Sequence, residues 1–173
     1  GLGAGSGIHV GGADISVSNV IASRRSTGVS ISGARPVISS VIANDNSGTG
    51  LQVIGVAGST PTLSNLTLRN NGSGLGLSSW STAFTVDGMN SLASLDVTGS
   101  ATGVSLDQSS NITLKNFSTP QTRTGVWAGG SSHRFENLDL SGSGGSGLYV
   151  HAGSGHVITD VTANGRRTGI ELQ

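Results

Sequence analysis

The chain has 173 residues, no cysteine and a formal net charge of zero, with 10% charged and 3% aromatic residues. Its length fits one domain with a sizeable core, and we expect residues 1–173 to form one domain. Without cysteine there is no disulfide or thiolate metal site, and a neutral chain has no long-range attraction to nucleic acid or to an anionic membrane. No apolar run approaches the ~18 residues that span a bilayer, so we expect no membrane insertion.

A four-residue unit of glycine, apolar residue, any residue and apolar residue recurs eight times. Successive glycines are 21, 22, 24, 29, 22, 22 and 22 residues apart, which indicates a solenoid whose periods stack as coils. The step of 29 residues follows the fourth unit and predicts an inserted loop over residues 78–90. In chain order the units cover residues 7–10, 28–31, 50–53, 74–77, 103–106, 125–128, 147–150 and 169–172.

A small polar residue stands nine or ten residues before each glycine from the second unit onward. Apolar residues lie two positions before it and one position after it, so each period holds three short strands with a tight polar corner between the first two. We expect the corner side chains to face inward and to form a hydrogen-bonded, Asn-type ladder, because an unpaired buried amide costs about 1–3 kcal/mol. The predicted ladder consists of Asn19, Ser40, Asn65, Ser94, Asn116, Asn137 and Asp160.

Short strands cannot pair within themselves, so each is expected to pair in parallel with its copy in the next coil, ~4.8 Å away. The sequence therefore predicts an all-β, single-chain parallel β-helix of about eight coils of about 22 residues. The three-strand period, the corner Asn residues and the glycine unit resemble the pectate-lyase-like superfamily of right-handed parallel β-helices. This resemblance implies a right-handed coil, but many functions share the fold, among them polysaccharide lyases, glycoside hydrolases, epimerases, phage tailspikes and bacterial adhesins.

The resemblance implies that the strand beginning at each repeat glycine lines a ligand groove. We expect Trp127 and Tyr149 to be stacking platforms for sugar rings and Gln52 to be a further contact, because exposed aromatic residues are rare in this chain. The alternative is that the aromatic residues cover one another and a loop around Trp80. One expected outward column is His9, Ser30, Gln52, Gly76, Ser105, Trp127, Tyr149 and Glu171, and the next is Gly11, Ser32, Ile54, Ser78, Asp107, Gly129, His151 and Gln173.

The candidates for acid–base chemistry are Asp107, His151 and Glu171. A glycosidase needs two carboxyl groups about 5–9.5 Å apart, whereas Asp107 and Glu171 are three coils apart, about 14 Å along the stack. The motifs Asn-Thr-Asp, Asp-Asp, Gly-His-Gly and Arg-Ile-Lys of polygalacturonase-like enzymes are absent. Enzymatic activity is therefore uncertain, and the pattern favours a non-catalytic segment.

The four histidines fall in different coils and columns, so we expect no metal site, and no cofactor is indicated. Two arginine doublets, at residues 24–25 and 166–167, occupy equivalent turns and are expected to be solvated turn charges.

The leading hypothesis is a secreted or surface-exposed module that contacts carbohydrate, from a polysaccharide-processing or phage-tailspike-like protein on a cell or virion surface. One alternative is a non-catalytic adhesin passenger or structural fibre segment. Another is a polysaccharide lyase or hydrolase whose site lies partly outside these residues. Bare ends of a parallel stack would expose strand edges, so we expect either a longer parent protein or ends covered by flanking domains or by a second copy of the chain.

Overall fold

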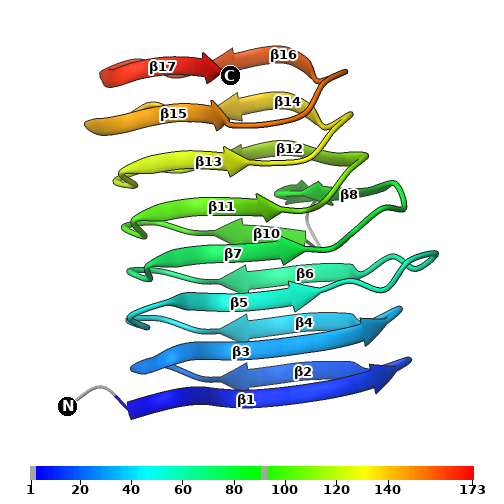
Figure 1. The fold of residues 1–173 in the computed structure, drawn as a ribbon. Helices are drawn as coiled ribbons and strands as arrows, with labels where there is room; N and C mark the ends of the chain where they lie inside the picture. Colours follow the sequence, from blue (N-terminus) through cyan, green and yellow to red (C-terminus); the bar gives the residue numbers. More distant parts are fainter. Residues whose placement is uncertain (1–2, 91–92) are drawn as a thin grey trace.

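The computed structural model describes residues 3–90 and 93–173, and these residues form a stack of short strands without a helix. The chain rises coil by coil from β1 to β17, with the main sheet in front and the second wall behind it (Figure 1). The main sheet is parallel throughout and contains all eight repeat units, so its eight strands bound seven complete turns. Its strands are β1 (Gly3–Ala13), β3 (Arg25–Ala34), β5 (Thr49–Ile54), β7 (Ser73–Ser78), β11 (Thr102–Asp107), β13 (Thr124–Ala128), β15 (Gly144–Val150) and β17 (Arg166–Leu172).

The second wall consists of two sheets built from the strands that alternate with those of the main sheet. All its pairings are parallel except that of β9 with β10. The N-terminal second sheet contains β2 (Ser16–Ile21), β4 (Val37–Ile42), β6 (Thr62–Thr67), β10 (Ala93–Asp96) and β9 (Met89–Asn90). The C-terminal second sheet contains β8 (Phe84–Asp87), β12 (Ile112–Ser118), β14 (Arg134–Asp139) and β16 (Val157–Thr162).

The strands of the second wall bend at the predicted polar corner. Six of the seven predicted corner residues have a left-handed backbone, which Asn and Asp adopt more readily than other non-glycine residues. Each bent strand supplies two arms of a coil and the main strand supplies the third, as the pattern predicted. The φ angles are 55° at Asn19, 53° at Ser40, 51° at Asn65, 59° at Asn116, 49° at Asn137 and 52° at Asp160. The side chain of Ser94, the seventh residue, lies outside the described part of the structure.

The expectation that the corner side chains face inward is wrong. A left-handed residue interrupts the alternation of a strand, so two successive side chains point outward: Ser18 and Asn19 are both exposed, between the buried Val17 and the partly buried Val20. The ladder therefore runs along the surface. Two hydrogen bonds of 2.9 Å connect its C-terminal part: Asn137 Nδ2 donates to Asn116 Oδ1, and Asn116 Nδ2 donates to Asp87 Oδ1.

A buried polar ladder does exist, at the turn that precedes the repeat glycine. Asn46 donates its backbone and side-chain N–H groups to Asn71 Oδ1, both at 2.9 Å, and Asn71 N donates to Ser100 Oγ at 3.2 Å. Asn71 Nδ2 also donates to Ala43 O (2.9 Å), and Ser100 Oγ donates to Leu68 O (3.0 Å). These side chains satisfy turn carbonyl and amide groups that would otherwise be buried without partners.

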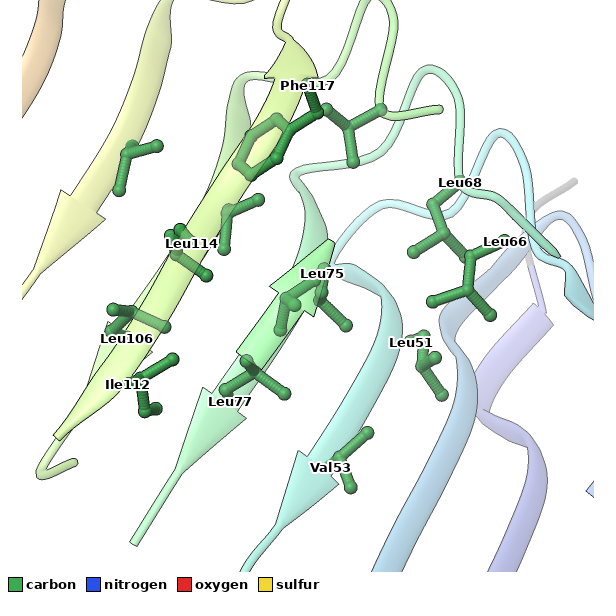
Figure 2. Packing of buried hydrophobic residues seen from close by; sticks show 14 of the residues in the cluster. Leu51, Val53, Leu66, Leu68, Leu75, Leu77, Leu106, Ile112, Leu114 and Phe117 are labelled. Carbon is green, nitrogen blue, oxygen red and sulfur yellow. The ribbon is translucent and has the colours of Figure 1, made fainter. Parts of the chain in front are cut away.

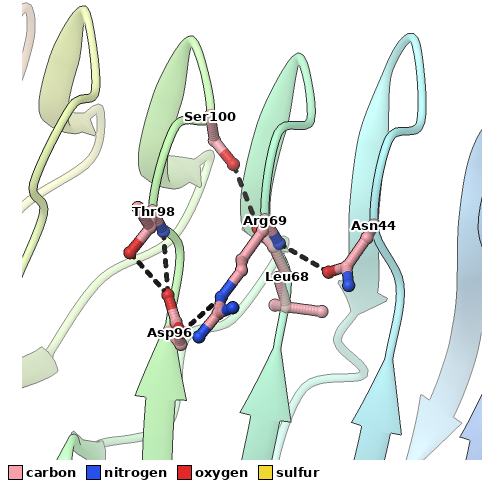
Figure 3. A network of polar contacts seen from close by, with 6 residues as sticks. All are labelled: Asn44, Leu68, Arg69, Asp96, Thr98 and Ser100. Carbon is pink, nitrogen blue, oxygen red and sulfur yellow. Dashed lines mark hydrogen bonds and ion pairs between the residues drawn. The ribbon is translucent and has the colours of Figure 1, made fainter.

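Figure 3 shows the buried bond from Ser100 to Leu68 together with contacts on the outer side of the same turns, which again join successive coils. Asn44 Oδ1 accepts a hydrogen bond from Arg69 N (2.8 Å), and Arg69 Nε donates to Asp96 Oδ2 (2.7 Å). Asp96 also accepts from the backbone and side chain of Thr98. The turn is therefore braced by polar contacts on its inner and outer sides.

The core is a continuous stack of Val, Leu and Ile side chains enclosed by the two walls (Figure 2). Equivalent core residues of successive coils lie beside one another: Leu51 pairs in register with Leu75, and Val53 with Leu77, and all four are fully buried. Each such side chain contributes about 1.5–3 kcal/mol relative to exposure.

The long step in the repeat splits one bent strand in two. Residues 78–90, where the spacing predicted an inserted loop, contain β8, which pairs with β12 through Val86 and Leu114. The second arm of that coil is β10, which pairs with β6 through Leu95 and Leu66. The additional residues therefore lie between β8 and β10.

Trp80 is a core residue, with 1% of its surface exposed. Its indole Nε1 donates to Val53 O at 3.2 Å, and its ring meets that of Phe84 edge-on at 5.3 Å. The indole also occupies the space beside Gly55, where a Cβ would lie 2.4 Å from the ring. Trp80 thus packs inside the coil instead of forming part of a loop over the outward aromatic residues.

Candidate functional site

The register of the main sheet places the outward residues in the expected columns. Ser105 pairs with Trp127, Trp127 with Tyr149, and Tyr149 with Glu171, on four successive strands. On the other side of Ser105, the column continues through Gly76 to Gln52. The hydroxyl residues that precede the repeat glycines share this outer face, because Ser146 Oγ donates to Glu171 Oε2 at 3.2 Å.

Three partly exposed rings form an aromatic cluster, which consists of Trp127, Tyr149 and His151. The imidazole of His151 stacks on the indole of Trp127 with 4.1 Å between ring centroids and 26° between ring planes, and it lies 6.1 Å from the Tyr149 ring at the same angle. His151 follows β15, and its ring reaches back over Gly129, where a Cβ would lie 2.4 Å from Nε2. A glycine at position 129 is therefore what allows His151 to reach Trp127.

A depression of about 330 Å³ borders Trp127 on the main sheet, and we call it the Trp127 depression. It extends across four strands, β5, β7, β11 and β13, which are about 14 Å apart from first to last. Ser105 lies between Trp127 at one end and Gln52, which covers Gly76, at the other. Its lining consists of Gln52, Gly76, Leu77, Ser78, Ser105, Asp107 and Trp127.

The polar groups of the depression are partly preorganised. Gln52 lies across Gly76, where a Cβ would stand 2.3 Å from Gln52 Oε1, and its Nε2 donates to Ser78 Oγ at 3.0 Å. The carboxylate of Asp107 is exposed and makes no hydrogen bond or ion pair with other residues that the structure describes. The depression therefore offers a free hydrogen-bond acceptor, the Asp107 carboxylate, next to the flat indole of Trp127.

The two remaining candidates, Tyr149 and Glu171, lie outside the depression. Tyr149 Oη donates to Gln173 Oε1 (3.1 Å), and Gln173 Nε2 donates to Glu171 Oε1 (3.1 Å). Asp107 and Glu171 are on β11 and β17, three strand steps and about 14 Å apart, which is too far for the carboxyl pair of a glycosidase. The Nε2 atom of His151 is buried against Gly129, and no hydrogen bond joins His151 to Asp107 or to Glu171.

Two histidines that the sequence placed apart meet at the turn after the main strands. The rings of His133 and His156 stack with centroids 5.5 Å apart. His133 is fully buried, its Nδ1 accepts from Ile112 N (3.3 Å) and its Nε2 faces Gly129 O (3.2 Å), so the hydrogen-bond pattern assigns a neutral ring with its proton on Nε2. Burial lowers the pKa of His133, and the neighbouring His156 adds to that effect.

The two histidines are structural acceptors of backbone N–H groups, since His156 Nδ1 also accepts from His133 N (3.3 Å). Within residues 3–90 and 93–173, no three His, Cys, Asp or Glu side chains lie close enough together to hold a metal ion. Those residues also contain no helix long and apolar enough to cross a membrane.

Arg166 is not the solvated turn charge that the sequence indicated. Its guanidinium reaches across two coils and passes Gly142, where a Cβ would lie 3.0 Å from Arg166 Cζ. Burial lowers the pKa of Arg166, yet an arginine remains charged at neutral pH. Its hydrogen-bond acceptors are the hydroxyl of Thr122 and five backbone carbonyl groups, those of Thr119, Thr122, Arg123, Leu140 and Ser141.

Comparison with known proteins agrees with the fold. A family model described as "Right handed beta helix region" matches residues 102–173, the part of the chain from β11 to β17. The parallel stack is the β-helix that the repeat spacing predicted, and the match gives it the right hand that the resemblance implied. No curated protein and no solved structure matches the chain. A module of this class fits a carbohydrate-related or surface role.

Proposed function

We propose that the chain is a carbohydrate-binding β-helical module, secreted or displayed on a cell or virion surface, and that the Trp127 depression is its binding site. The observation that carries the proposal is the position of Trp127. Its indole is partly exposed, is backed by His151 at 4.1 Å, and borders a depression lined by hydroxyl, amide and carboxylate groups. A polysaccharide-processing or tailspike-like parent protein is consistent with such a module.

The lining matches the chemistry of a sugar, which has an apolar C–H face and a rim of hydroxyl groups. The indole supplies a flat apolar surface, while Gln52, Ser78, Ser105 and Asp107 supply hydrogen-bond partners. The volume, about 330 Å³, is within the range of about 300–1,000 Å³ for small-molecule sites. The chain has six Phe, Trp and Tyr residues, and all except Trp127 and Tyr149 lie in or against the core; these four are Trp80, Phe84, Phe117 and Phe135.

We propose binding without catalysis at the main sheet, because Asp107 and Glu171 are about 14 Å apart, too far to act on one bond. A lyase or hydrolase with a site partly outside these residues would instead release reducing sugars or unsaturated products from a polysaccharide panel. Absence of such products together with retained binding would support the proposed role.

An adhesin or fibre segment is the second candidate, favoured by apolar residues exposed on the N-terminal second sheet. Ile21 and Ile42 have exposed fractions of 75% and 39%, and they border a groove of about 530 Å³. Such a surface is more apolar than a sugar site requires and would suit contact with protein. Under this hypothesis, Ile21→Ser would weaken attachment or assembly while Trp127→Ala would not.

The proposed function is tested by calorimetric titration of a glycan panel into the wild-type chain, Trp127→Ala and Ser30→Ala. Ser30 lies in the same column but outside the depression, so it is a matched control. We expect Trp127→Ala to raise Kd at least about tenfold, in line with the cost of truncating an aromatic anchor, and Ser30→Ala to leave Kd unchanged. Failure of the wild-type chain to bind any glycan, or unchanged binding by Trp127→Ala, would overturn the proposal.

A further inference from the structure

We propose that the Trp127 depression selects a neutral, hydroxyl-rich glycan and discriminates against chains of uronic acids. This inference rests on the proposed function and adds the chemical class of the ligand. It follows from the charges on the outer face of the main sheet, taken with the hydrogen-bonding groups that line the depression.

The depression has one charged side chain, Asp107, and it is negative. Three columns share the outer face around it: the two columns that contain Trp127 and Asp107, and the hydroxyl column formed by the residue before each repeat glycine. The hydroxyl column consists of Ser6, Thr27, Thr49, Ser73, Thr102, Thr124, Ser146 and Thr168. None of the three includes a lysine or an arginine between Ser6 and Gln173. A carboxylate on the ligand would therefore approach Asp107 without a cation on this face to offset the repulsion.

The basic residues of the chain are placed elsewhere. Four of them pair with acidic residues, as Arg35 with Asp14, Arg69 with Asp96, Lys115 with Asp87 and Arg134 with Glu136. Arg166 is bound by backbone carbonyl groups. Of the remaining arginines, Arg24 and Arg123 precede main strands, and Arg25 and Arg167 lie at the start of β3 and β17. Arg123, just before the strand of Trp127, is four residues from it, about 13 Å along an extended chain.

The hydrogen-bonding groups point to the same class. An ionised carboxylate accepts hydrogen bonds only, and two oxygens can accept from two neighbouring hydroxyl groups. Gln52 Oε1 adds an acceptor at the opposite end, and its orientation is fixed by the bond from Nε2 to Ser78 Oγ (3.0 Å). Sugar hydroxyl groups supply the donors that these acceptors require. A uronate carboxylate near Asp107 would lower affinity by about fivefold at a separation of about 4 Å, with the penalty reduced by salt.

The inference is tested by titrating three sets of oligosaccharides of equal length: neutral xylo-, manno- and cello-oligosaccharides, oligogalacturonates, and cationic glucosamine oligomers. The proteins are the wild-type chain, Asp107→Asn, Asp107→Lys and Asp160→Asn. Asp160→Asn removes one negative charge from an exposed corner of the second wall and is the charge-matched control.

We expect the wild-type chain to bind a neutral oligosaccharide at least fivefold more tightly than the oligogalacturonate of the same length. Asp107→Asn should weaken neutral binding several-fold, with little dependence on salt, because it removes an acceptor. Asp107→Lys should bring oligogalacturonate affinity up by about tenfold at low salt and less at high salt. Asp160→Asn should change none of these values.

Tighter binding of oligogalacturonate than of every neutral oligosaccharide, lost in Trp127→Ala, would overturn the neutral class while leaving the proposed function standing. Tighter binding of glucosamine oligomers with a steep salt dependence would also overturn it, in favour of a cationic ligand. If no glycan of any charge binds, the proposed function itself fails. The failure of the inference is thus distinguishable from the failure of the function.

Discussion

The imidazole of His151 and the indole of Trp127 form a stacked pair, with 4.1 Å between their centroids, across two adjacent coils of the main sheet. The pair fixes the plane of the indole before any ligand arrives, because His151 is itself held between Gly129 and the Tyr149 ring. A platform that is already oriented spares a ligand the entropic cost of ordering it. His151 is therefore a positioning residue for Trp127.

Replacing His151 by alanine is expected to loosen Trp127 and to weaken glycan binding. Aromatic pairs contribute about 0.5–1.5 kcal/mol beyond their buried area, so Kd should rise about two- to tenfold. Acrylamide quenching of indole fluorescence should increase at the same time, because Trp80 is buried and Trp127 accounts for the accessible signal.

A flat aromatic ring at position 151 should restore the stacking on Trp127 that His151→Ala removes. His151→Phe is expected to return both Kd and quenching towards the wild-type values, whereas His9→Ala, at the far end of the same sheet, should alter neither. Equal loss of binding in His151→Phe and His151→Ala would show that stacking is not the role of this residue.

The columns of the main sheet could be predicted from the sequence because side-chain direction alternates with a period of two and the repeat glycines fix the register. Trp127 and Tyr149 therefore lie beside each other as expected. The stacking of His151 on Trp127 could not be predicted, since it depends on a turn conformation after β15 and on the absence of a side chain at Gly129.

The features that the periodic pattern did not predict lie in the turns between strands. From the fourth unit onward, the position three residues before the repeat glycine carries Asn71, Ser100 and Thr122, which are all buried, and then Gly144 and Arg166. In the second and third units the same position carries Arg25 and Ser47, which are exposed, so the sequence alone could not show that Arg166 continues the buried column. The inward orientation predicted for the corner Asn residues was wrong because it assumed unbroken alternation through a left-handed residue.

The arginine doublet at residues 166–167 offers a matched pair for testing this buried column. Arg166→Ala removes charge-assisted hydrogen bonds to the turns of two preceding coils, and such bonds contribute about 1.5–3 kcal/mol. We expect a loss of about 2–3 kcal/mol in the free energy of unfolding, measured by urea titration. Arg167 is exposed, and Arg167→Ala should cost less than about 0.5 kcal/mol. Equal effects of the two variants would contradict the assignment.

The stability of the coil stack should fall as the pH falls through the titration range of histidine. Burial lowers the pKa of His133 below its ordinary value of 6.5. Between the lowered folded value and 6.5, the unfolded chain binds a proton that the folded chain does not, so the free energy of unfolding decreases with decreasing pH. The contribution is fully present above pH 6.5 and is lost as the pH falls towards the folded pKa. Urea midpoints measured from pH 8 to pH 5 test this directly.

The variant that separates this effect from other titrations is His133→Asn. Its amide oxygen can accept from Ile112 N as the imidazole Nδ1 does, yet it does not titrate. We expect a flatter dependence of the urea midpoint on pH than in the wild-type chain. His9→Asn, at an exposed site, should keep the wild-type slope. An unchanged slope in His133→Asn would contradict a buried neutral ring at this position.

The corner residues should be sensitive to side-chain shape even though they are exposed. Asn137 has a φ of 49° and donates to Asn116 Oδ1 at 2.9 Å. Asn137→Val adds a β-branched side chain to a left-handed residue, at about 1–2 kcal/mol, and removes the hydrogen bond, at about 0.5–1.5 kcal/mol. Asn137→Gly removes only the hydrogen bond, since glycine adopts this φ freely. We expect urea titration to show that the free energy of unfolding falls by about 2 kcal/mol in Asn137→Val and by about half of that in Asn137→Gly. Equal losses in the two variants would mean that the backbone conformation does not limit this position.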